Sequence, residues 1–332
     1  MVFDTAMGET GIDLARDFYV RRVAPLLSGV PHAAALLGNG SEVLGFDDEV
    51  SPDHDFGPRV QVFTSAEVSL PDGAEISTVP RFFAERLGVD PGAGMGLADW
   101  LLTPTQVLAT LTAGAVFHDP AGELGRYRAV LRWYPDDVWR YALAAGWLKV
   151  GQEEPFIGRT GATGDDLGSR IIAARLAREL VRLCFLLERR WAPYAKWLGR
   201  AFGELRLAVR VGPLLTAATG AGMWRDREAA FSAAASVVAA ATNDLGLCPP
   251  VDPAVRQFHD RDIRVLDAER FTVALTSAIT DPQVRALLDR VGLRRGEAVG
   301  RLPGTIDQAV DSTDVLTDTA RFRAAAPMLG LS

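Results

Sequence analysis

Apolar positions in the first third of the chain follow two periods, one typical of helices and one typical of short strands. Three segments have helical periodicity: residues 11–27, 80–87 and 104–113. Three short runs have the length and composition of strands: residues 32–37, 59–64 and 74–79. The first run ends in Gly38-Asn39-Gly40, a sequence typical of a turn. This part of the chain therefore predicts a sheet with helices packed on it.

After about residue 125 the helical period dominates. Four helices are predicted here, two beginning near residues 136 and 166 and two spanning residues 193–210 and 224–245. Asp165 or Asp166 is expected to cap the second of them. Glycine-rich residues 158–164 predict a loop, and residues 263–266 predict a short strand in a mixed C-terminal segment. We therefore expect an α+β fold, with a mixed sheet and helices followed by a mainly helical domain.

The composition is that of an ordinary folded protein, because 48% of the 332 residues are hydrophobic and 23% are charged. A net charge of −7 argues against a protein that binds long nucleic acid, although a local basic groove remains compatible with it. Two cysteines, Cys184 and Cys248, exclude a disulfide framework and a structural zinc site. We interpret Cys184, which falls within an apolar helix, as an unreactive core thiol.

The sequence suggests neither secretion nor insertion into a membrane. The first ten residues have no basic segment and no apolar core, so we expect no secretory signal. The most alanine-rich stretch, residues 233–241, is too short and too weakly apolar to span a bilayer. We therefore expect a cytoplasmic protein with no membrane partner.

Candidate chemistry is concentrated around Gly40-Ser41, directly after the first predicted strand. Asp53-His54-Asp55 begins twelve residues after Ser41 and leads into the second strand. Residues i and i+2 of an extended chain point to the same side, so Asp53 and Asp55 can share a cation. Mg²⁺ prefers carboxylates together with substrate phosphates, and a Gly-Ser turn presents N–H groups and a hydroxyl to such phosphates. A solvated acidic turn, and a helix cap at Ser41, are the alternative interpretations.

This arrangement resembles the nucleotidyltransferase superfamily of kanamycin nucleotidyltransferase and DNA polymerase β. Its pattern is Gly-Ser, about ten residues, then Asp-x-Asp, with a third acid on a neighbouring strand. Here the spacing is slightly longer, and Pro52 separates Ser51 from Asp53, whereas the usual motif has serine directly before the first aspartate. The resemblance implies that Glu75, between apolar neighbours in the third predicted strand, is the third acid. Four other acids compete for this role: Asp47, Asp48, Asp72 and Asp119.

A narrower resemblance, to the bacterial domain-of-unknown-function family 4037, covers most of the chain. Four segments carry it: residues 40–48 (GSEVLGFDD), 53–55 (DHD), 133–139 (WYPDDVW) and 193–197 (PYAKW). Members of this family are regarded as predicted nucleotidyltransferases. The likeness therefore implies the nucleotidyltransferase-like fold and leaves the substrate open.

The helical domain supplies further candidates. In antibiotic nucleotidyltransferases a lysine of the helical domain often reaches the triphosphate, and the resemblance implies that role for Lys196, with a hydroxyl contact from Tyr194. An ordinary surface lysine is the alternative. Four arginines lie roughly opposite a leucine stripe: Arg175, Arg178, Arg182 and Arg189. We interpret them as a solvated or salt-bridged face, with substrate contact as the alternative. Glu153 and Glu154 either bind a cationic acceptor or belong to an ordinary helix end.

The resemblance implies a metal-dependent nucleotidyltransferase, which moves a nucleoside monophosphate from ATP or another NTP to an oxygen of a small-molecule acceptor. Two Mg²⁺ ions would flank the α-phosphate. The implied residues are Asp53, Asp55 and Glu75 for catalysis and metal binding, and Gly40, Ser41, Tyr194 and Lys196 for the nucleotide. Transfer to a protein or tRNA, and a regulatory nucleotide-binding module without turnover, remain open alternatives. We expect a monomer or homodimer, with three parts: a catalytic domain at 1–125, a helical domain at 126–250, and a mixed extension at 251–332 packed on the helical domain.

Overall fold

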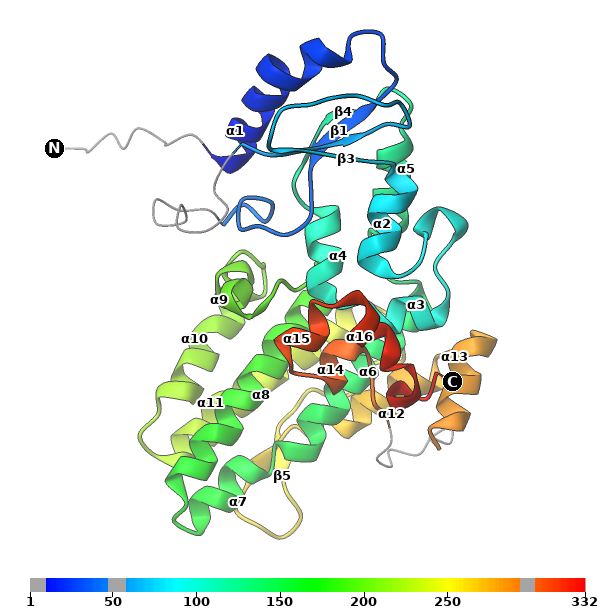
Figure 1. Ribbon diagram of the computed structural model, residues 1–332. Helices are drawn as coiled ribbons and strands as arrows, with labels where there is room; N and C mark the ends of the chain where they lie inside the picture. The colour runs from blue at the N-terminus through cyan, green and yellow to red at the C-terminus, as the bar shows by residue number, and fades with distance from the viewer. Residues whose placement is uncertain (1–9, 47–57, 293–301, 332) are drawn as a thin grey trace, which may run out of the picture. The chain divides into compact units, whose positions relative to one another are not determined.

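The computed structural model describes residues 10–46, 58–292 and 302–331, and it confirms the α+β fold (Figure 1). Two compact units divide the chain: Met1–Gly96 with Thr105–Arg132, and Leu97–Pro104 with Trp133–Ser332. The first unit contains a four-stranded mixed sheet, and the second is mainly helical. In the described ranges, no helix combines the length and the apolar character needed to cross a membrane.

The sheet of the first unit has the strand order β3-β2-β1-β4. Its strands are β1 (Ala33–Leu36), β2 (Val60–Phe63), β3 (Ala74–Ser77) and β4 (Ala115–His118). β1 is antiparallel to both β2 and β4, and β2 is parallel to β3. The first three strands lie within the three runs that the sequence predicts as strands. β4 was not predicted, because its four residues follow a helix closely and show no separate strand pattern.

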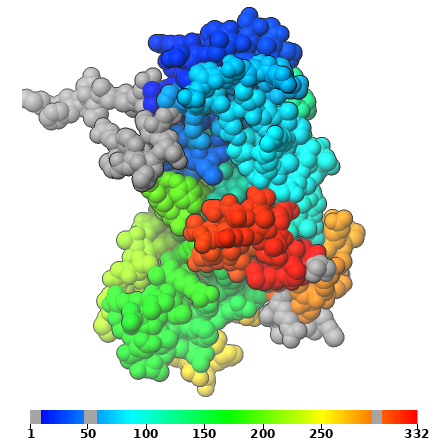
Figure 2. All heavy atoms as spheres, viewed as in Figure 1, coloured from blue at the N-terminus to red at the C-terminus, as the bar shows by residue number. Residues whose placement is uncertain are grey.

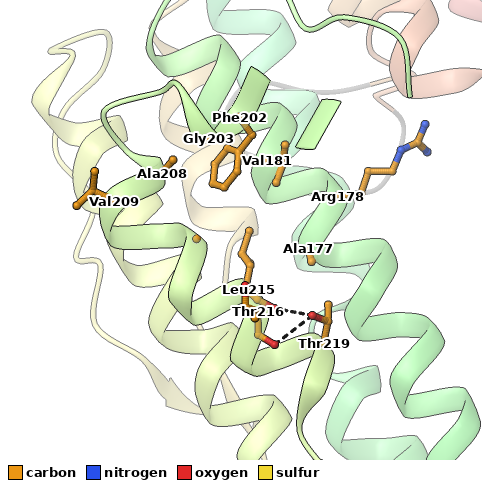
Figure 3. Close-up of a pocket in the computed structure, with 11 residues that line it drawn as sticks. Ala177, Arg178, Val181, Phe202, Gly203, Ala208, Val209, Leu215, Thr216 and Thr219 are labelled. Carbon is orange, nitrogen blue, oxygen red and sulfur yellow. Dashed lines mark hydrogen bonds between the residues drawn. The ribbon is translucent and has the colours of Figure 1, made fainter. Parts of the chain in front are cut away.

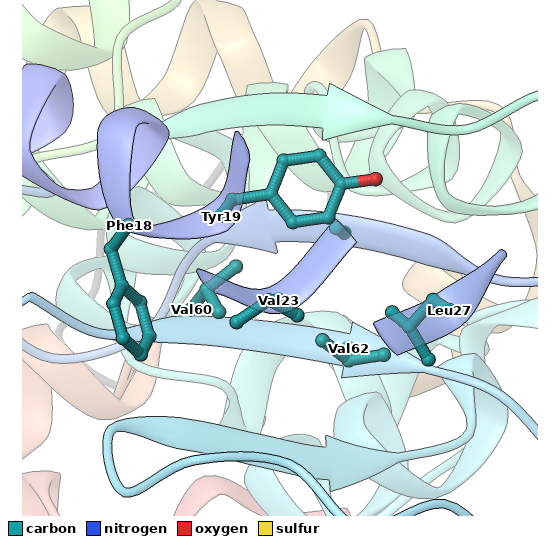
Figure 4. Packing of buried hydrophobic residues seen from close by; sticks show 7 residues of the cluster. Phe18, Tyr19, Val23, Leu27, Val60 and Val62 are labelled. Carbon is teal, nitrogen blue, oxygen red and sulfur yellow. The ribbon is translucent and has the colours of Figure 1, made fainter. Parts of the chain in front are cut away.

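The N-terminal helical segment covers one face of this sheet. It is continuous but changes type, from α1 (Gly11–Phe18) through the π-helix η1 (Tyr19–Val23) to the 3₁₀ helix η2 (Ala24–Leu27). Figure 4 shows four of its side chains packed on the strands. The buried residues of this cluster are Phe18, Tyr19, Val23, Leu27, Ala34, Val60 and Val62.

The opposite face of the sheet carries α2 (Val79–Leu87), on which Phe82 packs edge-on against Phe63 with 5.2 Å between ring centroids. Side chains alternate along a strand, so Gln61 shares this face with Phe63, whereas Val60 and Val62 enter the core described above. The other helices of this unit are η4 (Pro91–Ala93), α4 (Thr105–Thr112) and α5 (Glu123–Val130).

The second unit is a helical assembly around α6. Its main elements are α3 (Leu97–Leu102), α6 (Asp136–Glu153), α7 (Phe156–Ala162), α8 (Asp166–Leu187), α9 (Ala195–Gly203), α10 (Ala208–Gly220), α11 (Trp224–Asp244), β5 (Arg256–Gln257), β6 (Arg264–Val265), α12 (Glu269–Ser277) and α13 (Pro282–Arg290). Trp147 of α6 stacks on Phe271 at 4.9 Å and donates a hydrogen bond to the hydroxyl of Thr242 at 3.2 Å. Asp165 caps α8 by accepting the N–H of Gly168, as the sequence predicts.

The prediction of a loop at residues 158–164 is wrong, because most of this segment is helix α7. Its glycines serve close packing instead of a turn. A side chain at Gly158 would collide with Glu228, and one at Gly161 would collide with Trp224. Thr163 and Gly164 alone form the turn that follows the helix.

The prediction of a single helix over residues 193–210 is also wrong. The chain forms α9, breaks, and starts again as α10. The carboxylate of Glu188 accepts the backbone N–H groups of Arg206 (3.1 Å) and Leu207 (2.7 Å), just before α10 begins. Glu188 follows α8, and its carboxylate satisfies N–H groups at the start of α10. The local periodicity of residues 193–210 does not show this helix start.

The last part of the chain lies on helices of its own unit, as Figure 2 shows for the C-terminal residues in red over the helices in green. Its short helices are α14 (Ile306–Ala309), α15 (Thr313–Leu316), α16 (Thr319–Ala324) and η5 (Ala326–Leu329). Arg178 of α8 donates two hydrogen bonds to Asp311, at 2.8 and 2.6 Å. Lys149 of α6 donates to the carbonyl of Gln308 at 3.0 Å. These bonds hold the segment that begins at α14 against α6 and α8.

Candidate functional site

The Gly-Ser element forms a turn shortly after β1. The carbonyl of Ser41 accepts the N–H groups of Leu44 (3.1 Å) and Phe46 (2.9 Å). Residues 41–45 form turns and no helix, so Ser41 is not a helix cap. In the part of the chain that the structure describes, the N–H groups of Gly40 and Ser41 donate no hydrogen bond. Backbone N–H groups in a turn of this kind are the donors that commonly bind phosphate oxygens.

An arginine at the start of the second strand holds this turn in shape. Arg59 Nε donates to Glu42 Oε1 at 2.8 Å, and Arg59 Nη2 donates to the carbonyl of Asn39. Gly40 has φ +141°, and a side chain there would collide with both Arg59 and Glu42. The positive φ favours glycine at this position, and a side chain there would also displace the ion pair of Arg59 with Glu42.

Glu75, the predicted third acid, lies on β3 opposite Gln61 of the parallel strand β2. Gln61 is buried, and its Oε1 accepts the N–H of Leu37 at 2.8 Å. Its Nε2 donates to Glu75 Oε2 at 3.3 Å. Two hydrogen bonds through one buried amide therefore connect the end of β1 with Glu75.

Arg86 of α2 is the second partner of Glu75. Its Nη2 lies 3.2 Å from Glu75 Oε1, while its Nη1 donates to the carbonyl of Phe82 at 3.1 Å. The guanidinium carbon lies 3.6 Å from the centroid of the Phe82 ring. A Cβ atom at Gly38 would be 3.7 Å from Arg86 Nε, in ordinary van der Waals contact. Arg86 thus lies beside both Glu75 and the start of the Gly-Ser turn.

Two acids that compete with Glu75 are described. The carboxylate of Asp119 accepts the N–H groups of Gly125 (2.8 Å) and Leu124 (3.4 Å), at the start of α5. Asp72 is exposed in the turn before β3. Neither stands on a strand, whereas Glu75 does, as the resemblance requires of the third acid.

The principal predicted metal ligands, Asp53 and Asp55, lie outside the described residues, as do His54 and the competing acids Asp47 and Asp48. Among the described side chains, no group of three His, Cys, Asp or Glu residues is placed to hold a metal ion. Glu75 contributes one carboxylate, and both of its oxygens have partners. The described residues alone therefore do not fit a Mg²⁺ centre, and that prediction depends on Asp53 and Asp55.

The predicted nucleotide contacts of the second unit stand at the start of α9. Lys196 is exposed, and its Nζ lies 4.7 Å from the centroid of the Trp197 ring. Tyr194 precedes the helix, and its hydroxyl accepts the indole N–H of Trp197 at 2.7 Å. Both side chains therefore contact Trp197, and the role of each toward a nucleotide stays a prediction.

The four arginines of α8 and its end are engaged within the second unit. Their partners are, in order along the chain, Glu153, Asp311, the carbonyl of Asp307 and the ring of Trp139. Two of the four therefore form ion pairs, Arg175 and Arg178, while Arg182 bonds a backbone carbonyl and Arg189 lies over an aromatic ring. Substrate contact through any of them would first require that one of these interactions be broken.

Glu154 is also a structural residue. It is buried, and it accepts the N–H groups of Leu266 (2.7 Å) and Ala268 (2.8 Å). Burial raises the pKa of Glu154 to about 7, against the opposing effect of these hydrogen bonds. Its neighbour Glu153 pairs with Arg175 at 3.0 Å. The two carboxylates thus bind groups of the protein itself, which argues against a site for a cationic acceptor.

A pocket of about 530 Å³ opens between α8, α9 and α10 of the second unit (Figure 3). Its walls include Val181, Phe202 and Leu215. The hydroxyl of Thr219 donates to carbonyls of its own helix, and Arg178 is held by Asp311. The pocket therefore presents a mainly apolar surface, and its lining includes Arg178 but none of the residues predicted to bind metal or nucleotide.

Three residues around the Gly-Ser turn were missed from the sequence: Arg59, Gln61 and Arg86. Gln61 did carry a signal, because a polar side chain between two buried valines of a short strand needs a buried partner. The two arginines carried none, since their approach to the turn depends on the packing of β2 and α2 against β1.

Comparison with known families identifies one segment. Residues 100–198 match the model of the family described as "Domain of unknown function (DUF4037)". The match covers less than a third of the chain and includes two of the four segments that carry the resemblance, residues 133–139 and 193–197. Over these residues it confirms the resemblance to that family, and it does not test the wider one to nucleotidyltransferases. No curated protein and no solved structure matches the chain.

Proposed function

Residues 100–198 of this chain match the DUF4037 family. We propose that the chain is a metal-dependent nucleotidyltransferase. It would move a nucleoside monophosphate from ATP or another NTP to an oxygen of a small-molecule acceptor and release pyrophosphate. Asp53, Asp55 and Glu75 would hold Mg²⁺, which would supply charge stabilisation at the transferred phosphate. Gly40 and Ser41 would bind phosphate oxygens.

One observation carries the proposal: the buried amide of Gln61 connects the end of β1 with Glu75. The Gly-Ser turn starts immediately beyond this end, so Gln61 fixes its position relative to an acid two strands away. Phosphate-binding amides and an acid at a fixed mutual position are what nucleotidyl transfer needs, because positioning contributes much of its rate.

The described residues can carry out separate parts of this reaction. The amides of Gly40 and Ser41 can bind phosphate oxygens. Glu75, whose side chain is 45% exposed, can either ligate the metal or take the proton of the acceptor hydroxyl. The resemblance adds Lys196 and Tyr194 as further contacts for the nucleotide.

A regulatory nucleotide-binding module is the second candidate, and one observation favours it. Both oxygens of Glu75 have partners in the protein, Arg86 and Gln61. Such an acid could serve as a fixed structural anchor for the turn and take no part in turnover. The two functions differ in whether pyrophosphate is released.

The test is incubation of the purified chain with each common NTP and Mg²⁺, with a cell extract as the source of acceptors. Pyrophosphate is measured, and small molecules and proteins are analysed by mass spectrometry. We expect Mg²⁺-dependent pyrophosphate release and a small molecule that gains the mass of a nucleoside monophosphate. A mass gain on a protein or tRNA would move the acceptor to that class. NTP binding without pyrophosphate release would favour the regulatory module, and no NTP binding would refute both functions.

A further inference from the structure

We propose that Arg86 is a phosphate-binding residue of the Gly-Ser turn, and that Arg59 is the positioning residue that shapes this turn. The inference rests on the proposed function and extends it to residues that the sequence did not indicate. It assigns the polyphosphate of the nucleotide to the side of the turn where Gly38 meets Arg86. The ligand class is a linear polyphosphate, either free or as part of an NTP.

Arg86 is held in place before any ligand arrives. Its guanidinium stacks on the ring of Phe82 and donates to the carbonyl of the same residue. Phe82 itself is fully buried, so this support is rigid. The Arg86 side chain nevertheless remains 30% exposed. A preorganised and accessible guanidinium loses little conformational freedom when it binds an anion.

The chemistry of this position suits phosphate. A guanidinium presents five N–H donors in a planar fork, and two of them can bind two oxygens of one phosphate. The amides of Gly40 and Ser41 add neutral donors nearby in the chain. Gly38 has no side chain to separate the turn from Arg86. A Cβ atom built at this position would already be in van der Waals contact with Arg86 Nε.

Arg59 has a different role, because its hydrogen bonds go to residues of the turn itself. Its Nε and Nη2 both face Glu42 Oε1, and Nη2 also donates to the carbonyl of Asn39. These bonds span the turn on both sides of Gly40. Arg59 therefore acts on a ligand through the shape of the turn.

Because Arg86 pairs with Glu75, changes at these two residues should alter polyphosphate affinity in opposite directions. A polyphosphate that binds Arg86 competes with the Glu75 carboxylate for the same guanidinium. Removal of the Glu75 charge should therefore strengthen polyphosphate binding in the absence of metal. An ion pair that served stability alone would leave the Kd of tripolyphosphate unchanged when the Glu75 charge is removed.

The experiment measures binding of inorganic tripolyphosphate, and of ATP, to the full chain by titration calorimetry in buffer with EDTA. The variants are Arg86→Gln and Glu75→Gln. Matched controls come from the same helix, where Arg81 and Glu85 form an exposed pair at 2.7 Å: Arg81→Gln and Glu85→Gln. Thermal unfolding shows whether each variant is folded. If Arg86→Gln does not fold, Arg86→Lys is used in its place.

We expect Arg86→Gln to raise the Kd of both ligands about ten- to a hundredfold, as for the loss of charge-assisted hydrogen bonds. Glu75→Gln should lower the Kd of tripolyphosphate severalfold, and both controls should match the unmodified chain. If Arg86→Gln behaves like Arg81→Gln while the unmodified chain binds ATP, the role of Arg86 is refuted and the proposed function stands. If the unmodified chain binds neither ligand, both fail.

Discussion

Asp137 connects the start of α6 with the loop before α13, and its removal gives a sharp test of how the second unit is held together. Its Oδ2 accepts the N–H groups of Thr280 (2.8 Å) and Asp281 (2.5 Å) and the hydroxyl of Thr280 (3.1 Å). Its Oδ1 accepts Arg140 Nη1 at 2.6 Å. One buried carboxylate thus serves a donor of its own helix and donors that lie 143 and 144 residues further along the chain.

Asp137→Ala would leave the guanidinium of Arg140 without its charge partner and two backbone N–H groups without an acceptor. Breaking a buried ion pair costs about 3–5 kcal/mol, and each stranded donor costs about 1–3 kcal/mol. These costs are not additive, and Arg140 keeps its hydrogen bond to the carbonyl of Leu247, so we expect the free energy of unfolding to fall by at least about 3 kcal/mol. The neighbouring Asp136 is exposed, and Asp136→Ala should cost less than about 1 kcal/mol through the helix dipole.

Urea unfolding followed by tryptophan fluorescence suits this comparison, because all seven tryptophans belong to the second unit.

The loss of stability in Asp137→Ala should also depend on pH. Burial opposes ionisation of Asp137, but hydrogen bonds from Asp281, Thr280 and Arg140 outweigh it and hold the pKa of Asp137 below its ordinary value of 3.8. A lowered pKa contributes stability above the unfolded-state pKa, and this contribution is lost as pH falls through the folded-state pKa.

The stability difference between the unmodified chain and Asp137→Ala should therefore be constant from pH 7 to pH 5 and should narrow below about pH 3.8. Two results would refute this reasoning. One is an equal loss for Asp136→Ala and Asp137→Ala. The other is a difference that does not change down to the lowest pH at which the chain folds.

Three further predictions concern single residues. Gly40→Ala should abolish NTP-dependent turnover by displacing the turn, with little change in the tryptophan-detected unfolding; full turnover would contradict the packing at this glycine. Gln61→Leu should leave the buried N–H of Leu37 without an acceptor and destabilise the first unit by about 1–3 kcal/mol. Mass spectrometry should then show faster hydrogen exchange in β1, and an unchanged exchange rate would contradict this prediction. Cys184 should resist maleimide in the folded chain, because burial raises its pKa to about 12, whereas the half-buried Cys248 should react slowly; equal labelling of both would argue against the buried position.

The sheet could be predicted where the signals were local. The first three strands are short apolar runs bounded by turn residues, and the turn at Gly38 follows from its own sequence. β4 was not predicted, because a four-residue strand close behind a helix has no hydrophobic pattern of its own. The glycines of α7 were misread because a glycine required by close packing looks the same in sequence as one required by a turn.

Interactions between distant segments could not be predicted. The carboxylate of Glu188 starts α10 from another helix, and nothing in the local periodicity of residues 193–210 shows it. The same limit applies around the Gly-Ser turn. Spacing indicated Gly40 and Ser41, and the resemblance to nucleotidyltransferases indicated Glu75, but the packing of β2 and α2 brings Arg59 and Arg86 to them.

The central claim, nucleotidyl transfer with Asp53 and Asp55 as metal ligands, is tested most directly by pyrophosphate release from an NTP in the presence of Mg²⁺. Asp53→Asn and Asp55→Asn keep the shape of each side chain and remove its charge, and Asp72→Asn makes the same change at an exposed acid before β3. We predict that the unmodified chain and Asp72→Asn release pyrophosphate, while each metal-ligand variant is slower by at least about a hundredfold with an unchanged melting temperature. Full turnover by Asp53→Asn and Asp55→Asn would contradict the claim.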